Sequence, residues 1–297
     1  MEIPLAGLAQ SGRDFLCTFQ AMATPCEIRV ETADAELAER VAQAGVAVAR
    51  HVEEKFSRYR NNSVISQINS ADGREVEVDP ETAHLLDFAE QCFELGGGLF
   101  DVTSGVLRRV WRFDGSDNVP EPSQIESLRK LVGWEKVTWR RPYLRLPSGM
   151  EIDFGGLAKE YAVDLALAVA RRVAPVPILV NFGGDLAVSG PREHGQKWHV
   201  AIASVETDSG MAAMLELAGG GLATSGNARR FLLKDGVRYG HILDPRTGWP
   251  VSDAPRSVTV AAACCVEAGM MATLAMLRGA RSEKFLKREG VRAWCIR

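Results

Sequence analysis

Apolar residues recur at two different periods along the chain, and the period separates expected strands from expected helices. Residues 26–31 alternate in polarity, as a half-buried strand does. From Asp34 to about residue 58 the apolar positions are three or four residues apart, which predicts a long amphipathic helix with Asp34 as its N-cap. A second helix is expected from Pro80 to about residue 95, where three consecutive glycines end it.

The rest of the chain is rich in short strands. Residues 114–122 are interpreted as a loop, and further helices are expected after residue 156, ending near residue 173, and from 267 to 276. Strands are expected at residues 75–78, 137–139, 143–146, 178–181, 198–203, 214–217, 231–233, 238–243 and 258–263. Strands joined by turns and interrupted by helices favour an α+β fold over a regular parallel α/β fold.

No linker, internal repeat or low-complexity tract divides the chain. We interpret residues 1–20 as a loose N-terminal segment and residues 21–297 as a single domain with two lobes.

Composition and charge narrow the class of protein. The net charge of −3 offers no basic excess for binding a nucleic-acid backbone. No apolar run approaches the roughly 20 residues of a membrane span, and the first residues lack the pattern of a signal peptide or a lipobox cysteine. The cytoplasm is therefore the expected compartment. Six cysteines without C-x-x-C spacing indicate buried free thiols rather than disulfides or zinc ligands.

The segment 151–159 carries the first candidate chemistry. An expected strand ends at Asp153, Gly155 and Gly156 let backbone approach a ligand, and Lys159 follows within the first turns of an expected helix. Free N–H groups, the helix dipole and a lysine together favour an anion. Neither phosphate-binding glycine motif is present, so a plain strand-to-helix turn is an equally good interpretation.

Two more small-residue segments follow expected strands. Residues 181–185 form a second Gly-Gly-acid turn, and residues 221–226 form a third loop that is rich in hydroxyl groups. Each alone is better explained as a turn. Three such segments in one chain fit a large ligand that is held mainly by backbone groups.

A histidine and an acid stand near the end of another expected strand. His241 is a candidate general base, and Asp244 a candidate to orient it or to bind a metal. A histidine that only hydrogen-bonds the following turn is the competing interpretation. The segments 97–103 and 57–60 add Phe100 and Tyr59, which are candidates either for stacking on a flat ring or for packing.

Taken together, these segments resemble the ApbE family, the FAD:protein FMN transferases. The likeness comes in the order of the family and covers most of the chain. It rests on the segments 22–26, 56–59 with Ser63 and Asn69, 98–103, 153–159, 180–185, 223–226 and 241–248.

The resemblance implies a fold related to the tunnelling fold, with FAD in the crevice between two lobes. It implies transfer of the FMN half of FAD to a Thr or Ser hydroxyl of a partner protein, with release of AMP. Asp153 and Lys159 would hold the ribose and the diphosphate, and His241 would activate the acceptor hydroxyl. The remaining cofactor-binding residues that it implies are Met22, Tyr59, Leu99, Phe100, Asp101 and Ile242.

The family also implies Mg²⁺, held by a backbone carbonyl (here Gly156) and by an Asp followed four residues later by Thr. Thr273 matches, but Gly269 stands in the place of the aspartate. Losing that carboxylate should weaken metal binding unless Asp244, Asp153 or Glu267 replaces it. A second departure is Glu160, where the family usually has glycine.

Three activities follow as alternatives. The first is a flavin transferase whose acceptor belongs to a redox complex. The second is an FAD diphosphatase that uses water in place of the protein hydroxyl. The third is an FAD-binding protein with weakened catalysis, motivated by Gly269.

Overall fold

The computed structural model describes residues 7–204, 210–227 and 230–297. Its centre is an antiparallel sheet of eight strands, in the order β1-β2-β3-β7-β8-β11-β14-β15. These strands are β1 (Leu8–Ser11), β2 (Asp14–Ala21), β3 (Thr24–Glu31), β7 (Ile178–Phe182), β8 (Asp185–Val188), β11 (Gly220–Gly226), β14 (Ser257–Ala262) and β15 (Arg292–Ile296).

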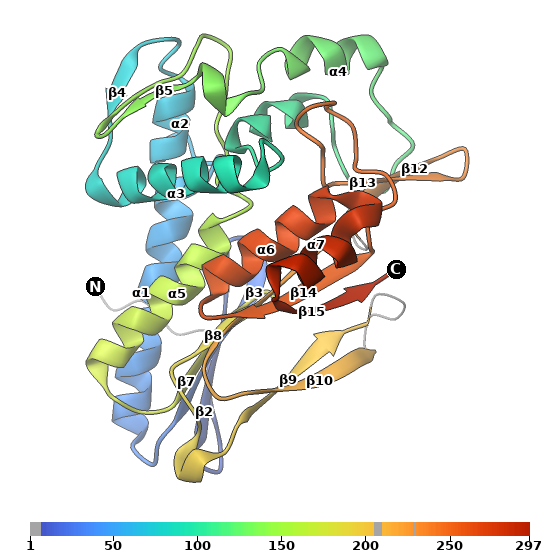
Figure 1. Ribbon diagram of the computed structural model, residues 1–297. Helices are drawn as coiled ribbons and strands as arrows, with labels where there is room; N and C mark the ends of the chain where they lie inside the picture. Colours follow the sequence, from blue (N-terminus) through green and yellow to red (C-terminus); the bar gives the residue numbers. More distant parts are fainter. Residues whose placement is uncertain (1–6, 205–209, 228–229) are drawn as a thin grey trace.

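Helices cover one face of this sheet, and a hairpin covers the other (Figure 1). The helices on the sheet are α1 (Ala35–Phe56), α5 (Ala158–Val173), α6 (Cys265–Leu277) and α7 (Ser282–Glu289). The hairpin consists of β9 (Trp198–Ala203) and β10 (Met211–Leu217). The alternation within β7 shows why both faces are covered: Ile178 and Val180 enter the main core beneath the helices, whereas Leu179 enters the core beneath the hairpin.

The second lobe is built from residues between α1 and α5 and lies above the sheet in Figure 1. It holds a three-stranded sheet in the order β4-β6-β5. Its elements are α2 (Val64–Asn69), β4 (Glu75–Glu77), α3 (Pro80–Gly96), the 3₁₀ helices η1 (Val102–Arg109) and η2 (Trp134–Lys136), α4 (Pro122–Arg129), β5 (Thr138–Arg140) and β6 (Tyr143–Arg145). Beside it, the hairpin of β12 (Phe231–Lys234) and β13 (Val237–Gly240) packs Leu232 against η1 and α4.

Local sequence signals explain where the main helices begin and end. The Asp34 side chain accepts a hydrogen bond from Leu37 N at the start of α1, as an N-cap does. Asp79 caps α3, Pro80 occupies its first turn, and Gly97 ends it in the left-handed conformation. One hydrophobic cluster runs from Phe15 to Leu286 and joins both lobes, which supports the proposal of a single domain.

The α+β architecture with antiparallel sheets flanked by helices is confirmed. Several local expectations are wrong. Residues 8–20 belong to β1 and β2 rather than to a loose segment, because Phe15, Cys17 and Phe19 are buried in the sheet; residues 1–6 lie outside the described part. The expected loop at 221–226 is the inner strand β11, and the segment before Gly155 is not a strand.

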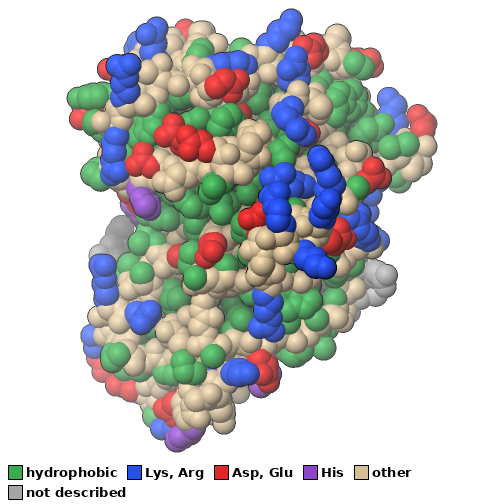
Figure 2. Space-filling model, in the orientation of Figure 1, with side chains coloured by type: hydrophobic (Ala, Val, Ile, Leu, Met, Phe, Trp, Pro, Cys, Tyr) green, Lys and Arg blue, Asp and Glu red, His purple; other side chains and the backbone are tan. Residues whose placement is uncertain are grey.

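Basic side chains gather on one face of the molecule, over the end of α6 and the start of α7 (Figure 2). Arg278 and Arg281, between α6 and α7, and Arg288, in the last turn of α7, lie close enough that burial and the neighbouring arginines lower the pKa of Arg278. Within the described residues, no helix combines the length and the apolar character that crossing a membrane requires.

Candidate active site

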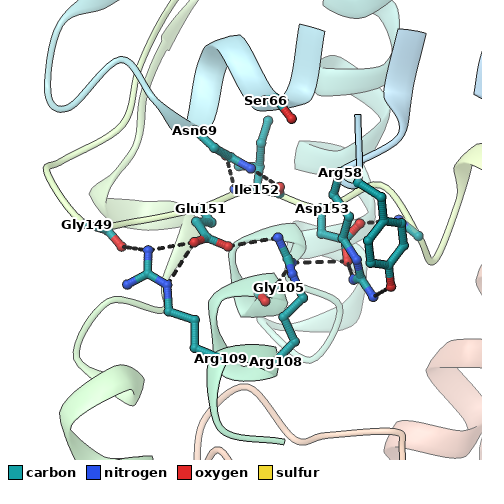
Figure 3. A network of polar contacts seen from close by, with 12 residues as sticks. Arg58, Ser66, Asn69, Gly105, Arg108, Arg109, Gly149, Glu151, Ile152 and Asp153 are labelled. Atoms are coloured by element: carbon teal, nitrogen blue, oxygen red, sulfur yellow. Dashed lines mark hydrogen bonds and ion pairs between the residues drawn. The ribbon is translucent and has the colours of Figure 1, made fainter. Parts of the chain in front are cut away.

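The segment that precedes the Gly155-Gly156 turn is held by side chains from distant parts of the chain (Figure 3). On one side, the Asn69 amide pairs with Ile152: Ile152 N donates to Asn69 Oδ1 at 2.8 Å, and Asn69 Nδ2 donates to the Ile152 carbonyl at 3.0 Å. On the other side, Arg108 and Arg109 both donate to the Glu151 carboxylate, at 2.6–2.8 Å. These contacts hold residues 151–154, which belong to none of the strands in the described part of the chain.

Two arginines converge on Asp153. Arg58, just past the end of α1, makes an ion pair with Asp153 Oδ2, and Arg108 Nη1 lies 3.5 Å from the same oxygen. Burial lowers the pKa of Arg58, but Asp153 and Tyr59 outweigh it and raise that pKa overall. Arg58 also donates to the Tyr59 hydroxyl at 2.6 Å and lies over its ring. Tyr59 and Asp153 are thus joined through Arg58, and the Tyr59 side chain is 80% exposed.

Lys159 lies in the first turn of α5 and makes an ion pair with Asp185 at the start of β8. Asp185 is buried, and its other oxygen accepts a hydrogen bond from Thr224 N on β11 at 2.9 Å. Burial alone would lower the pKa of Lys159, but Asp185 and Glu160 raise it, so the ammonium stays charged. The 153–159 and 181–185 segments therefore meet at this ion pair, as a shared ligand site requires.

Glu160, the next residue of α5, faces Gly269 of α6. A Cβ placed on Gly269 would lie 2.6 Å from Glu160 Cγ and 3.0 Å from its Oε1. Burial, and after it the Asp185 carboxylate, raises the pKa of Glu160 to about 8, against the opposing effect of Lys159. Residues 160 and 269, two departures from the family that are far apart in the sequence, therefore face each other in the structure.

The tip of the β2–β3 hairpin carries Met22. Met22 and Ala23 form a two-residue turn in which both have positive φ, 52° and 56°, a conformation that non-glycine residues rarely adopt. Met22 N donates to Glu53 Oε1 of α1 at 2.7 Å. Gly183, at the β7–β8 turn, packs so closely on this hairpin that a Cβ there would overlap Thr24 Oγ1. The hairpin tip is thereby fixed near the 181–185 turn.

Leu99, Phe100 and Asp101 lie where α3 passes into η1. Leu99 and Phe100 are both buried in the main core, and the Phe100 ring would lie 3.5 Å from a Cβ on Gly156. The Asp101 carboxylate accepts hydrogen bonds from Thr103 N at 2.8 Å and from Trp134 N at 3.1 Å. Its geometry is that of a helix cap, so its carboxylate positions this turn.

His241 follows β13 instead of ending a longer strand. Its ring meets Phe113 edge-on with centroids 6.3 Å apart, and its Nδ1 is buried without a hydrogen-bond partner among the described residues. Burial, followed by the Arg230 charge, lowers the pKa of His241 to about 4. The next residue, Ile242, packs on the main core.

Asp244 does not orient His241 through any contact in the described part of the chain. Its carboxylate instead accepts two hydrogen bonds from the Arg246 guanidinium, at 2.6 and 2.9 Å. The turn that follows docks on the second lobe, where Trp111 Nε1 donates to the Gly248 carbonyl at 2.9 Å.

The expected replacements for the missing aspartate point elsewhere. The Asp153 carboxylate makes an ion pair with Arg58, and that of Asp244 makes one with Arg246. Glu267, at the start of α6, accepts a hydrogen bond from Ala263 N at 3.3 Å. Thr273 lies one turn after Gly269 and donates to Ser225 Oγ at 3.4 Å. Within the described residues, no three His, Cys, Asp or Glu side chains are grouped as a metal cluster.

The donors near α5 and α6 nevertheless fit a hard cation such as Mg²⁺. Glu160 Oε2 is buried without a hydrogen-bond partner in the described ranges. No backbone N–H of those ranges donates to the Gly156 carbonyl. Mg²⁺ takes oxygen ligands, usually one or two carboxylates, and keeps several waters.

Most of the expected site segments therefore meet in two neighbouring groups. Asp153 and Tyr59 belong to the arginine network, and Lys159 to the buried ion pair six residues later. Sequence reasoning missed Arg58, Arg108 and Asp185 as partners; the signal available for Asp185 was its place after a Gly-Gly turn. A hollow of about 380 Å³ near Lys197, Glu216 and Arg292 is lined by Gly221 of the 221–226 segment but by none of the candidate catalytic, cofactor-binding or metal-binding residues.

Comparison with known proteins identifies relatives of this chain. The model of the ApbE family matches residues 22–295. The FAD:protein FMN transferase of Vibrio cholerae is 30% identical over 235 residues, which is 77% of this chain and 70% of the relative. The protein of the same name from Salmonella typhimurium is 28% identical over 255 residues, 81% of this chain and 72% of the relative.

Solved structures of this family have the same fold. The crystal structure of the ApbE protein from Thermotoga maritima superposes with a TM-score of 0.87 and 30% identity, covering 95% of this chain and 94% of that one. The apo form of the flavinyl transferase ApbE from Pseudomonas stutzeri gives a TM-score of 0.84 at 25% identity, covering 100% and 93%. The chain therefore belongs to the ApbE family.

Proposed function

We propose that this chain transfers the FMN moiety of FAD to a Thr or Ser hydroxyl of an acceptor protein and releases AMP. The observation that carries the proposal is the family match over residues 22–295, together with relatives named FAD:protein FMN transferase. That range includes every candidate site segment, from the hairpin at Met22 to Thr273.

The reaction is a phosphoryl transfer. The acceptor oxygen forms a bond to the phosphorus of the FMN half, the bond from that phosphorus to the bridging oxygen breaks, and the electron pair leaves with AMP. The hydroxyl proton goes to a base, for which His241 is the candidate. Because its pKa lies near 4, its imidazole is neutral at pH 7 and free to accept a proton.

Binding and charge neutralisation supply the rest of the catalysis in such reactions. Asp153, held in place by two arginines, is suited to accept hydrogen bonds from a ribose. Lys159 is suited to the diphosphate, because it stands in the first turn of α5, where its own charge and the helix dipole both favour an anion. The residues proposed to line the ring pockets are Met22, Tyr59, Leu99, Phe100, Asp101 and Ile242.

Mg²⁺ would be held by the Gly156 carbonyl and the Thr273 hydroxyl, and when bound it would neutralise charge on the diphosphate. Asp244 is proposed to act indirectly, since Arg246 engages its carboxylate and the turn that it caps fixes the His241 segment.

The acceptor is proposed to belong to a redox complex that carries covalent FMN, and the reaction is proposed to take place in the cytoplasm.

An incubation with FAD, Mg²⁺ and a purified acceptor domain, analysed by intact mass, tests the proposal. One added FMN on the acceptor is the expected result. Release of FMN and AMP without labelling identifies a diphosphatase, and tight FAD binding without turnover identifies a binding protein; both overturn the transferase.

A variant pair ties the chemistry to the site. His241→Asn removes the candidate base, and we expect labelling to slow by about 100-fold or more. His84→Asn, at an exposed position of α3, is the matched control and leaves the rate unchanged. Equal rates for both variants would remove His241 from the mechanism.

A further inference from the structure

One buried carboxylate lacks an ion-pair partner among the described residues. Glu160 is 9% exposed, and its Oε2 has no hydrogen-bond partner in the described part of the chain. The ammonium group within reach, that of Lys159, makes its ion pair with Asp185. Were Glu160 ionised, two carboxylates and one ammonium would carry a net charge of −1 in a buried place, so burial beside Asp185 favours the protonated carboxyl unless a further cation compensates the charge.

The Glu160 side chain occupies space that Gly269, on the facing helix α6, leaves open. Because a Cβ on Gly269 would lie 2.6 Å from Glu160 Cγ, residues 160 and 269 have room for one carboxylate between them. In this chain the carboxylate comes from α5, and α6 supplies the glycine that accommodates it. The two residues are 109 positions apart in the sequence (269 minus 160).

Two further oxygen donors stand on α6 and just before α5. Thr273 lies one helical turn after Gly269, so both residues are on the α6 face that meets α5. Gly156 stands four residues before Glu160, just ahead of α5, and the Phe100 ring packs on it. A carboxylate, a hydroxyl and a free carbonyl form a donor set for a hard divalent cation.

We propose that Glu160 is the carboxylate ligand of a divalent cation bound between α5 and α6, with Thr273 and the Gly156 carbonyl as the other protein ligands. The metal's catalytic role rests on the proposed function, but its binding does not, and binding is measured here without FAD or acceptor.

The direct test is titration of the purified chain with Mn²⁺, followed by the electron paramagnetic resonance signal of the free ion. The wild type should bind one Mn²⁺. Glu160→Gln keeps the shape and removes the charge, and it should raise the Kd by more than about tenfold. Glu267→Gln, at the start of α6, is the control carboxylate and should leave the Kd unchanged.

A reciprocal exchange makes the test specific. Glu160→Gly should lose the ion, and Gly269→Asp alone should be destabilised, because its side chain would collide with Glu160. The double variant Glu160→Gly/Gly269→Asp moves the carboxylate to α6 and should regain a Kd within about threefold of the wild type. Mn²⁺ should raise the Tm of the wild type and of the double variant, but not that of Glu160→Gln.

Several results would overturn the inference: a wild type that binds no Mn²⁺, a Glu160→Gln variant that binds it normally, or a stable double variant that fails to regain it. The first two would show that Glu160 is a protonated partner of Asp185. If binding follows Glu160 but no acceptor is labelled, the inference stands and the proposed function fails. If the acceptor is labelled and Glu160→Gln binds Mn²⁺ as tightly as the wild type does, the inference is wrong and the proposed function stands.

Discussion

The Asn69 side chain pairs with both backbone groups of Ile152, as a neighbouring strand would. Ile152 N donates to Oδ1 at 2.8 Å, and Nδ2 donates to the Ile152 carbonyl at 3.0 Å. Ile152 itself is fully buried, so these backbone groups have no access to bulk water. A single amide at the end of α2 thereby fixes the segment that presents Asp153.

Asn69→Ala should therefore leave a buried N–H and a buried carbonyl unpaired. We expect a loss of about 1–3 kcal/mol in the free energy of unfolding, measured by urea denaturation. Gln67→Ala, on the exposed side of the same helix, is the control and should change stability by less than about 0.5 kcal/mol. Equal losses in both variants would mean that the pairing contributes little.

Arg58→Ala should weaken FAD binding, because Asp153 would no longer be held in place by this arginine. The variant loses the ion pair to Asp153 and the hydrogen bond to Tyr59, and we expect the Kd for FAD to rise about tenfold, measured by quenching of flavin fluorescence. Arg60→Ala alters an exposed arginine two residues later and should bind FAD as the wild type does. An unchanged Kd in Arg58→Ala would separate this arginine from the site.

His241 should make stability depend on pH in mildly acidic solution. Its pKa is about 4 in the folded chain, against 6.5 for a free histidine, so the unfolded chain binds more protons between these values. The stability that the neutral ring contributes is complete above pH 6.5 and is lost as the pH falls towards 4, by up to about 3 kcal/mol.

Comparing the wild type with His241→Gln in urea at several pH values checks this expectation. The difference in their free energies of unfolding should shrink from pH 7 to pH 4 and then level off. A difference that stays constant over that interval would show that His241 keeps an ordinary pKa in the folded protein.

Gly183→Ala should destabilise the contact between the β7–β8 turn and the β2–β3 hairpin. Gly183 has φ +65°, and an added Cβ would overlap Thr24 Oγ1. Gly12, with φ +62° and open space around its Cβ, is the matched control for the cost of the left-handed backbone alone, about 1–2 kcal/mol. We expect Gly183→Ala to cost about 1–3 kcal/mol more than Gly12→Ala in thermal unfolding; equal costs would contradict the packing argument.

Periodicity and capping residues were enough to predict the long helices and most strands. Asp34 and Gly97 mark helix ends through local chemistry, which a sequence displays directly. The expected loop at 221–226 was wrong because the cause of its small residues is a contact with a distant part of the chain, which the local sequence does not display. Glycines and hydroxyl residues indicate a turn by composition, but Gly221 is small because the backbone of Cys265 at the start of α6 lies against it.

The candidate site was harder to predict because its contacts join distant residues. Asp153 and Lys159 could be singled out from one segment, whereas their partners Arg58 and Asp185 have no local signal that links them to it. The two departures at residues 160 and 269 were visible in the sequence, but only the helix packing shows that they face each other.

The Arg58–Asp153 ion pair joins the two points where the chain leaves α1 and returns towards α5. The second lobe is therefore topologically an insertion whose ends meet, the arrangement that host domains tolerate best. Lengthening or shortening its loops would leave the register of the central sheet untouched. Relatives could thus diverge in this lobe, and with it in the surface offered to an acceptor, while the chemistry below stays the same.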